Sequence, residues 1–447
     1  MPFRFVPLNY PSMKQPPRVL GVVFLTVFLD IVGFSVLFPL FPALLDHYLA
    51  VEGSASSLGQ LAAWLREMAA GDSMAVHALF GGILGSLYGI LQFVFSTLWG
   101  GMSDRIGRRP VLLMTLTGTV LSYVLWVFAG SFSILIAARI LGGAMAGNIS
   151  TASAAVADTT TPKDRAKGMG MVGMAIGLGF ILGPAIGGLS SFIHLPGVDS
   201  GIAPDSVFSL NPFSIPALAS LALGILNIIW VALKFPETLP PEKRGLGVDQ
   251  RSLNPFARLR TLDAPGILAT NLLYLTFLTA FSASEFSLTF LAAERLDYTP
   301  RELTGIFVFV GLIIAVVQGG FVRRLAPKYG ERKLATIGLA TIVPGLIWIA
   351  SAQTSSALYS GLAFLAVGSA LAMPCLSALV SRYAPTENQG LAMGTFRSMG
   401  SLARAFGPLF GAVLYWQLGS QAPYYASAII LVIPIWVTLR LPSPQDA

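Results

Sequence analysis

The sequence predicts an all-α membrane protein with twelve transmembrane helices in two pseudo-symmetric six-helix bundles. Composition is the first observation behind this prediction: of 447 residues, 54% are hydrophobic and only 11% are charged, against roughly 25% charged in soluble domains. The second is the recurrence of apolar runs of about 20 residues, each long enough to cross a bilayer as a helix. The third is an internal repeat that relates the two halves of the chain. The composition therefore excludes a soluble enzyme with a single membrane anchor.

Twelve segments have the length and the hydropathy of a membrane span. We expect helices over residues 18–43, 77–100, 110–130, 132–157, 166–192, 213–234, 266–292, 301–323, 333–352, 355–382, 389–417 and 421–440. An even number of spans brings both termini to one side, where 22 of the 28 Lys and Arg residues then lie. Cytoplasmic loops carry such an excess. The sequence therefore predicts a multi-pass protein of the cell (inner) membrane with both termini in the cytoplasm, and the net charge of +7 indicates topology rather than a nucleic-acid partner.

A polar and basic loop separates the first six spans from the last six. The predicted parts of the chain are a cytoplasmic tail 1–17, an N-terminal bundle 18–234, a central cytoplasmic loop 235–265, a C-terminal bundle 266–440 and a cytoplasmic tail 441–447. Two insertions, 45–76 and 193–212, are expected outside the membrane. Residues 58–68 of the first insertion have the pattern of a short amphipathic helix. No role is predicted for either insertion.

The first span carries an aspartate far from either end. Asp30 lies 12 residues into the span, about 18 Å from the cytoplasmic side at a rise of 1.5 Å per residue. An ionisable group at that depth costs roughly 2.5–3.5 kcal/mol on insertion scales, which makes it a functional candidate. Arg139 in the fourth span is expected near the same depth. The two side chains would therefore pair across the N-terminal bundle.

The seventh span corresponds to the first span in the second half of the chain, and it carries Glu285. Burial favours the neutral form of a carboxyl group, and a nearby arginine favours its charged form. An arginine that approaches and withdraws would therefore make such a carboxyl group release and bind a proton. We expect Asp30, Arg139 and Glu285 to take part in this proton exchange. A static ion pair that only fixes helix packing is the alternative for each acid.

Aromatic and polar residues share faces of several predicted spans, at 100° per residue. Aromatic walls with a few polar groups suit a bulky amphiphilic ligand, and helix packing or lipid contact is the alternative for each aromatic side chain. The residues expected to line this cavity are Phe34, Tyr88, Gln92, Ser150, Tyr274 and Phe281.

The fifth span contains the stretch GFILGPAIGG, residues 179–188. In a soluble helix each interior glycine costs roughly 1 kcal/mol and a proline roughly 3 kcal/mol. In a membrane, small residues instead let two helix backbones approach closely, and neighbouring helices satisfy the carbonyl that proline frees. The stretch therefore predicts a bent helix packed tightly against a partner. The residues expected to form this hinge are Gly179, Gly183, Pro184, Gly187 and Gly188.

The two halves of the chain repeat one another. The motif GPxxG occurs once in the fifth span and once in the eleventh. Gly107 of one basic loop precedes Pro184 by 77 residues, and Gly330 of another precedes Pro408 by 78 residues. Parallel repeats of this kind are typical of two-bundle transporters, in which the substrate site lies at the midplane between the bundles.

Several motifs resemble those of a known family. The loop GGMSDRIGRR, residues 100–109, resembles the GxLADRxGRK motif that major facilitator superfamily proteins carry between helices two and three. The fifth span resembles the GxxxGPxxGG motif of proton-driven antiporters of that superfamily. The first span around Asp30 and the fourth span around Arg139 resemble motifs of the twelve-helix drug:proton antiporters. Along nearly its whole length the chain resembles the tetracycline-efflux-like members of this branch.

The resemblance implies a conformational latch in the loop between the second and third spans. Asp104 would face the positive N-terminal end of the eleventh helix, and Arg108 would help to hold the latch. The corresponding loop of the second half has Arg323 and Arg324 and no aspartate at the equivalent place. The residues expected in the latch are Gly100, Asp104, Arg105, Gly107, Arg108 and Arg109.

The resemblance further implies the major facilitator fold and a secondary active transporter that works by alternating access. Proton antiport would export hydrophobic or amphiphilic small molecules such as tetracycline-like drugs, with the proton gradient as energy source and no cofactor. A proton-coupled transporter of a metabolite, sugar or lysolipid on the same fold is the alternative. The sequence has no nucleophile, metal or phosphate constellation, so neither an enzyme nor a metal site is expected. The expected partners are a small-molecule substrate, protons and the lipid bilayer, and the chain is expected to be a monomer.

Overall fold

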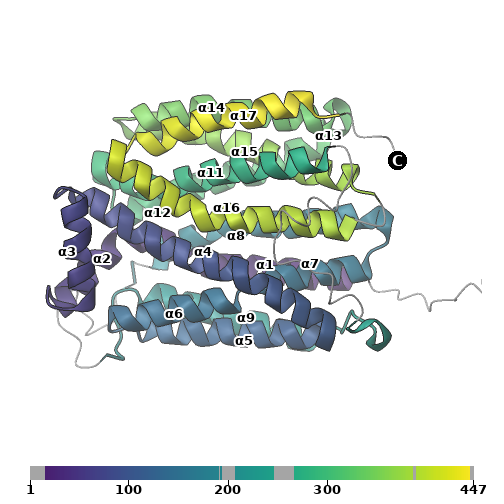
Figure 1. Cartoon of the computed structure of the whole chain (residues 1–447), viewed down its shortest axis with the longest axis horizontal. Helices are drawn as coiled ribbons and strands as arrows, with labels where there is room; N and C mark the ends of the chain where they lie inside the picture. Colours follow the sequence, from purple (N-terminus) through teal and green to yellow (C-terminus); the bar gives the residue numbers. More distant parts are fainter. Residues whose placement is uncertain (1–15, 191, 194–206, 246–265, 386–388, 443–447) are drawn as a thin grey trace, which may run out of the picture.

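Helices run side by side along the long axis of the molecule, and short segments join their ends (Figure 1). The computed structural model describes residues 16–190, 192–193, 207–245, 266–385 and 389–442. Within these ranges the chain is helical apart from turns, loops and one isolated β-bridge between Ala129 and Phe208. The predicted all-α fold class is therefore confirmed. Most of the predicted tails, of the central loop and of the insertion 193–212 lies outside the described residues.

The first half of the chain begins with a long helix and ends with the sixth predicted span. Its helices are α1 (Pro16–Ser35), α2 (Phe41–Glu52), α3 (Ser57–Met68), α4 (Ser73–Ile106), α5 (Arg108–Val127), α6 (Phe132–Met145), α7 (Asn148–Thr159), α8 (Pro162–Ser190) and α9 (Ser214–Lys234). Helix α3 confirms the short helix expected in the first insertion. Helices α2 and α3 lie at one end of the molecule, on the left in Figure 1, and we call this end the α3 side.

The second half has the same long-helix organisation. Its helices are α11 (Ile267–Leu296), α12 (Pro300–Val316), α13 (Arg323–Tyr329), α14 (Glu331–Ser351), α15 (Ser355–Tyr383), α16 (Gln389–Leu418) and α17 (Ala422–Arg440). A π-helical segment, Val317–Val322, joins α12 to α13. The C-terminal helix ends opposite the α3 side (Figure 1).

Eleven helical segments of the described chain are long and apolar enough to cross a membrane. They account for eleven of the twelve predicted spans. The remaining one, predicted over 389–417, forms the continuous helix α16 but is not among the eleven. Two arginines, Arg397 and Arg404, and several small polar residues lower its hydropathy. Its polar groups lie against other helices rather than against lipid: both arginines contact α8 residues.

Two predicted spans are interrupted. The first span continues past α1 as a 3-10 turn, Phe38–Leu40, and then as α2, because Pro39 and Pro42 remove backbone donors from the helix. The fourth span was predicted to be continuous over 132–157, but it breaks between α6 and α7. There the Trp99 indole N–H donates to the Ala144 carbonyl at 2.6 Å. That carbonyl would bond to the next helical turn in an unbroken helix.

The GPxxG motifs occupy equivalent places in the two halves. In the first half, Gly183 of α8 packs against Val32 and Ser35 of α1. In the second half, Gly407 of α16 packs against Ser282 and Ala283 of α11. The fifth helix of each half therefore approaches the first helix of the same half through glycine, as internal duplication predicts.

The two halves meet closely along α4 and α16. A side chain at Gly82 would contact Ala412, and one at Gly89 would contact the backbone of Ala405. Between these glycines, Ser86 Oγ accepts a hydrogen bond from the Leu409 backbone N–H at 3.1 Å. This tight seam lies in the half of α4 nearest the α3 side (Figure 1).

Candidate functional site

Asp30 of α1 lies inside the N-terminal bundle, with only 6% of its surface exposed. Asn148, at the first turn of α7, donates from Nδ2 to Asp30 Oδ1 at 2.8 Å. The Asn148 side-chain carbonyl in turn accepts a hydrogen bond from the Thr115 hydroxyl of α5. Helix α7 thus holds the Asp30 carboxylate directly through Asn148, and α5 holds it indirectly through Thr115. Both partner groups are neutral. Sequence reasoning overlooked Asn148 and Thr115, although an amide within a predicted span was a usable signal.

The expected ion pair between Asp30 and Arg139 is absent from the described structure. The Arg139 guanidinium of α6 instead lies over two aromatic rings, 4.5 Å from the centroid of Tyr88 and 5.5 Å from that of Phe34. A cation over a ring face is favourable in a desolvated site. Equal depth along two helices was therefore insufficient to predict contact, because Asn148 occupies the position next to the carboxylate.

An aromatic cluster lies between Arg139 of α6 and Arg404 of α16. Phe34 and Tyr88 stack with centroids 4.4 Å apart, and Phe180 of α8 meets the Phe34 ring edge-on at 5.9 Å. The Arg404 guanidinium lies 5.6 Å from the centroid of the Phe180 ring. Arg139 and Arg404 are therefore connected through aromatic rings of the first half.

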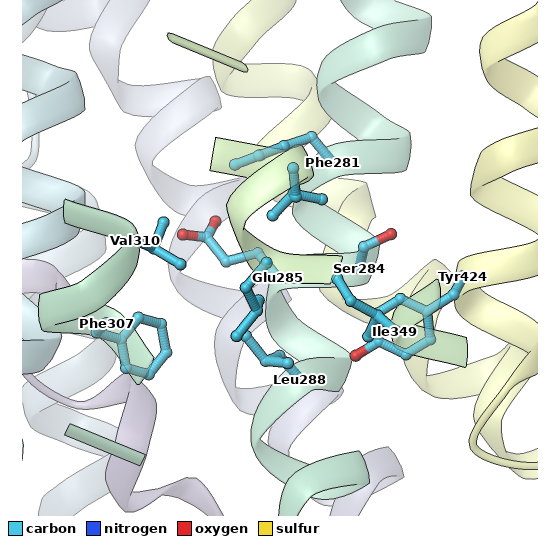
Figure 2. A pocket seen from close by; sticks show the side chains of 10 residues that line it. Phe281, Ser284, Glu285, Leu288, Phe307, Val310, Ile349 and Tyr424 are labelled. Atoms are coloured by element: carbon cyan, nitrogen blue, oxygen red, sulfur yellow. The ribbon is translucent and has the colours of Figure 1, made fainter. Parts of the chain in front are cut away.

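Glu285 of α11 lines a cavity inside the C-terminal bundle together with Phe281, as the shared helix face predicted. Figure 2 shows its carboxylate on the side of the cavity where Val310 of α12 lies, with Ser284 and Tyr424 on the other side. Ser284 donates its hydroxyl proton to a carbonyl within α11. The cavity is apolar apart from these few groups, so a carboxylate here is poorly solvated.

The six predicted cavity residues divide between two small cavities of the described structure and other places. Phe34 and Tyr88 line a small cavity in the N-terminal bundle with Arg139, and Phe281 lines the one that contains Glu285. Tyr274 belongs to neither and stacks on Phe396 of α16 at 3.9 Å. Gln92 and Ser150 also line neither. Ser150 instead donates to the Ser96 carbonyl at 2.9 Å. A helical-wheel argument gives the face of a residue but not the helix that it meets.

Three arginines lie within helices of the described structure and away from the helix ends: Arg139 is buried, and Arg397 and Arg404 are partly buried. Arg397 donates from Nη2 to the Met169 carbonyl of α8 at 2.8 Å, and Arg404 donates to Ser401 at 3.4 Å. Within the described residues, neither arginine forms an ion pair with a carboxylate within 4 Å.

The predicted latch is built around Arg108. Its Nη1 donates to Asp104 Oδ1 at 2.6 Å and to Ser103 Oγ at 2.7 Å, and its Nε donates to Asp158 Oδ2 of α7 at 2.8 Å. Arg108 is buried, so this network is shielded from solvent. Asp158 was not predicted from the sequence, because it lies 50 residues further along the chain.

A second carboxylate holds the backbone of the same loop. Glu237, which follows α9, accepts the backbone N–H groups of Arg108 and Arg109 at 2.9 and 3.2 Å. Gly107 has a φ of 111° and lies directly against this carboxylate. A residue with a Cβ would be strained there and would displace Glu237. Glycine is therefore required at this position, because the backbone has a positive φ and because the Glu237 carboxylate leaves no room for a side chain.

The remaining latch residues occupy the edges of this network. Arg109 donates from Nη2 to the Ala232 carbonyl at 2.7 Å, Gly100 packs near Ser150, and Arg105 is exposed. The expected contact between Asp104 and the first turn of α16 adjoins residues 386–388, which lie outside the described residues. That contact stays a prediction.

The hinge glycines follow the helical repeat along one face of α8. Gly179 and Gly183 lie against the Phe28 and Val32 carbonyl groups of α1, and Gly187 lies against the carbonyl of Val36, the residue after α1. The Ser35 hydroxyl adds a hydrogen bond to the Gly179 carbonyl at 3.1 Å. The predicted close partner of the fifth span is therefore α1.

The hinge also reaches the other half of the molecule. Gly188 abuts Thr304 of α12, and a Cβ at Gly188 would overlap its hydroxyl. Pro184 lies within α8. The α3-side end of α8 thus contacts α1 through one face and the C-terminal half through another.

Breaking the latch should slow transport without weakening substrate binding. We expect Asp104→Asn to reduce turnover at least about fivefold, because the loop sets the balance between conformations and does not contact ligand. Transport and ligand binding would be measured on the same purified variant, with Glu242→Gln, an exposed acid of the adjacent segment, as control. Unchanged turnover in Asp104→Asn and in Arg108→Ala would contradict the latch assignment.

Comparison with known proteins finds relatives that match most of this chain. The profile described as Major Facilitator Superfamily matches residues 23–329 and 319–447. Major facilitator superfamily domain-containing protein 10 of Bos taurus is 35% identical over 460 residues, which cover 96% of this chain and 95% of the relative. Tetracycline resistance protein, class C, of Escherichia coli is 27% identical and covers 89% of this chain and 90% of its own length.

Solved structures give the same result. The crystal structure of the human organic anion transporter MFSD10 (TETRAN) superposes with a TM-score of 0.78, 32% identity, and coverage of 95% of this chain and 99% of the other. A bacterial homolog to the human lysosomal transporter Spinster, in an inward-facing conformation, gives a TM-score of 0.66 at 13% identity, over 97% of this chain and 100% of the other. The second likeness concerns the fold alone.

Proposed function

The chain belongs to the major facilitator superfamily, whose members are membrane transporters and not enzymes, and from this premise we propose that it is a proton-coupled antiporter of amphiphilic organic anions. It is expected to work as a monomer by alternating access, in the cell (inner) membrane with both termini in the cytoplasm. The proposal keeps the amphiphilic substrates expected from the sequence and adds their charge.

The observation that carries the proposal is a pair of arginines that extend from α16 to the other half of the molecule. Arg397 donates to the Met169 carbonyl and Arg404 lies over the Phe180 ring, both in α8, and neither forms an ion pair with a carboxylate of the described residues within 4 Å. Charged groups inside a membrane protein mark substrate and ion pathways and are stabilised by opposite charge. An anionic substrate between the bundles would offset this positive charge, whereas a cation would add to it.

The relatives support the same substrate class. The human protein of the solved structure is described as an organic anion transporter, and the bacterial relatives as tetracycline resistance proteins. The aromatic ring of Phe180 beneath Arg404 suits the flat apolar part of such compounds. Both descriptions fit an amphiphile with an aromatic body and an acidic group.

Antiport of an anion against a proton has an electrical consequence. In a one-to-one exchange, export of an anion and import of a proton both move positive charge inward. Each elementary charge gains about 2.3 kcal/mol per 100 mV, so an inside-negative potential would drive export through both ions.

The test uses purified protein in liposomes and a sulfonated aromatic dye, whose permanent charge prevents passive movement. With equal dye on both sides and the membrane potential held at zero, a pH one unit lower outside should lower the internal dye up to about tenfold in a one-to-one exchange. A cationic dye of similar size should not move, and liposomes without protein serve as control. Proton-driven movement of a sugar, metabolite or lysolipid, with neither dye moved, would favour the alternative function instead.

A further inference from the structure

Arg139 is a buried cation without an anionic partner in the described chain. Its side chain is 5% exposed, and no carboxylate of the described residues lies within salt-bridge distance. Its Nε and Nη2 donors also find no acceptor among those residues. The two rings beneath it, Phe34 and Tyr88, supply only a weak partial charge. Leaving a buried charge unpaired is strongly destabilising, so this guanidinium calls for an anion.

Two further donors line the same cavity. The Tyr123 hydroxyl and the Trp126 indole N–H both belong to α5, on one face of the helix because they are three residues apart. These side chains are 6% and 2% exposed, and neither donor has an acceptor among the described residues. Both residues line the small cavity next to Arg139. Three side chains that line one enclosed space thus carry donors without an acceptor among the described residues.

The lining of this cavity contains no acid. Thr119 and Ser122 also line it, and each donates its hydroxyl proton to a carbonyl within α5. Asp30, the acid of the same bundle, is engaged by Asn148. The stacked rings of Phe34 and Tyr88 form one wall. The space that remains fits a guest of about the size of one water molecule, which excludes a whole organic substrate.

We propose that this cavity binds a small inorganic anion of halide size, held by Arg139, Tyr123 and Trp126. A bound water could exchange hydrogen bonds with the Thr119 and Ser122 hydroxyl groups of the lining, but it would leave the guanidinium charge uncompensated. A halide accepts several hydrogen bonds, brings no proton and neutralises the arginine. The site is separate from the transported substrate, so its test needs no transport measurement.

The first measurement is the unfolding temperature of the full-length purified protein in detergent, titrated with sodium chloride while sodium gluconate keeps the ionic strength constant. A ligand that binds only the folded state raises the unfolding temperature with its concentration. We expect the unfolding temperature to rise with chloride or bromide and not with gluconate, which is too large for the cavity.

Two variants and two matched controls locate the effect. Tyr123→Phe and Trp126→Phe each remove one donor from the cavity and should weaken the apparent chloride affinity by about tenfold. Tyr48→Phe and Trp99→Phe remove a hydroxyl and an indole N–H that already have carbonyl acceptors, those of Ala129 and Ala144. These two should keep the wild-type chloride response.

The chloride-free state gives a second readout that is independent of affinity. Without an anion, Tyr123→Phe and Trp126→Phe should not lower the unfolding temperature through a lost hydrogen bond, because their donors have no protein acceptor to lose. The two controls should lower it. The cavity variants should therefore differ from the controls in both readouts: they need more chloride for the same stabilisation, and they lose no hydrogen bond in its absence.

Three results would overturn the proposal. One is an unfolding temperature of the wild type that is the same in chloride and in gluconate. Another is an equal chloride response in the cavity variants and the controls. A third is stabilisation by an organic anion alone, lost in Trp126→Phe, which would assign the cavity to the acidic group of the substrate.

Discussion

Gly183→Leu is expected to abolish transport even in protein that reaches the membrane. A Cβ at this position would overlap the Ser35 hydroxyl and would lie 2.7 Å from the Val32 carbonyl oxygen. Both atoms belong to α1, and one of them is rigid backbone, so the larger side chain must push α8 and α1 apart. Overpacking of this kind costs typically about 1–3 kcal/mol. The same helix contacts α12 of the C-terminal half at Gly188, so a shift of α8 would also change a contact between the two halves.

The matched control for this variant is Gly177→Leu on the same helix. A Cβ at Gly177 meets no atom within 4 Å, so this substitution adds the same side chain without a clash. Transport would be measured in liposomes and divided by the amount of folded protein. Near-normal turnover of Gly183→Leu would show that close approach of α8 and α1 is not needed for transport. Equal loss in Gly177→Leu would attribute the effect to side-chain size in α8 generally.

Asp30→Asn is expected to abolish proton-driven uphill export while downhill exchange of substrate continues. Asparagine keeps a side-chain oxygen that can accept the hydrogen bond from Asn148, so the packing of α1 and α7 is preserved. It cannot exchange a proton. Export of the sulfonated dye would be measured with and without a pH difference, and downhill counterflow of the same dye would report binding and conformational change.

Glu285→Gln provides the matched comparison in the other half of the molecule. It removes the charge from the cavity that Phe281 and Glu285 share, so we expect it to change which organic anions are accepted. Uphill export of the anionic dye should persist. If Asp30→Asn still responds to the pH difference and Glu285→Gln does not, the two roles are reversed.

Much of the fold was predictable from the sequence. Apolar runs gave the membrane-spanning helices, and the amphipathic pattern of residues 58–68 gave α3. The break in the fourth span was not predictable in the same way. It depends on the Trp99 indole bonding to the Ala144 carbonyl, 45 residues further along the chain. Nothing in the sequence of the fourth span itself indicates that contact.

The candidate site was predictable as a set of residues and not as a set of contacts. Asp30 and Glu285 were found because a carboxylate within an apolar run is costly wherever the helix packs. The partner of Asp30 proved to be Asn148 and not Arg139. Likewise, Asp158 and Glu237 hold the latch loop from far along the chain.

The sequence by itself determined which segments are helices in the membrane, which glycines allow close packing and which charged residues lie within apolar spans. These properties are local, because hydropathy, helix period and side-chain size act residue by residue. Only the tertiary structure decided that α1 is the partner of the glycines in α8 and that Arg139 shares a cavity with Tyr123 and Trp126. Such contacts depend on which helices meet and at what height, and the packing of the whole molecule sets both.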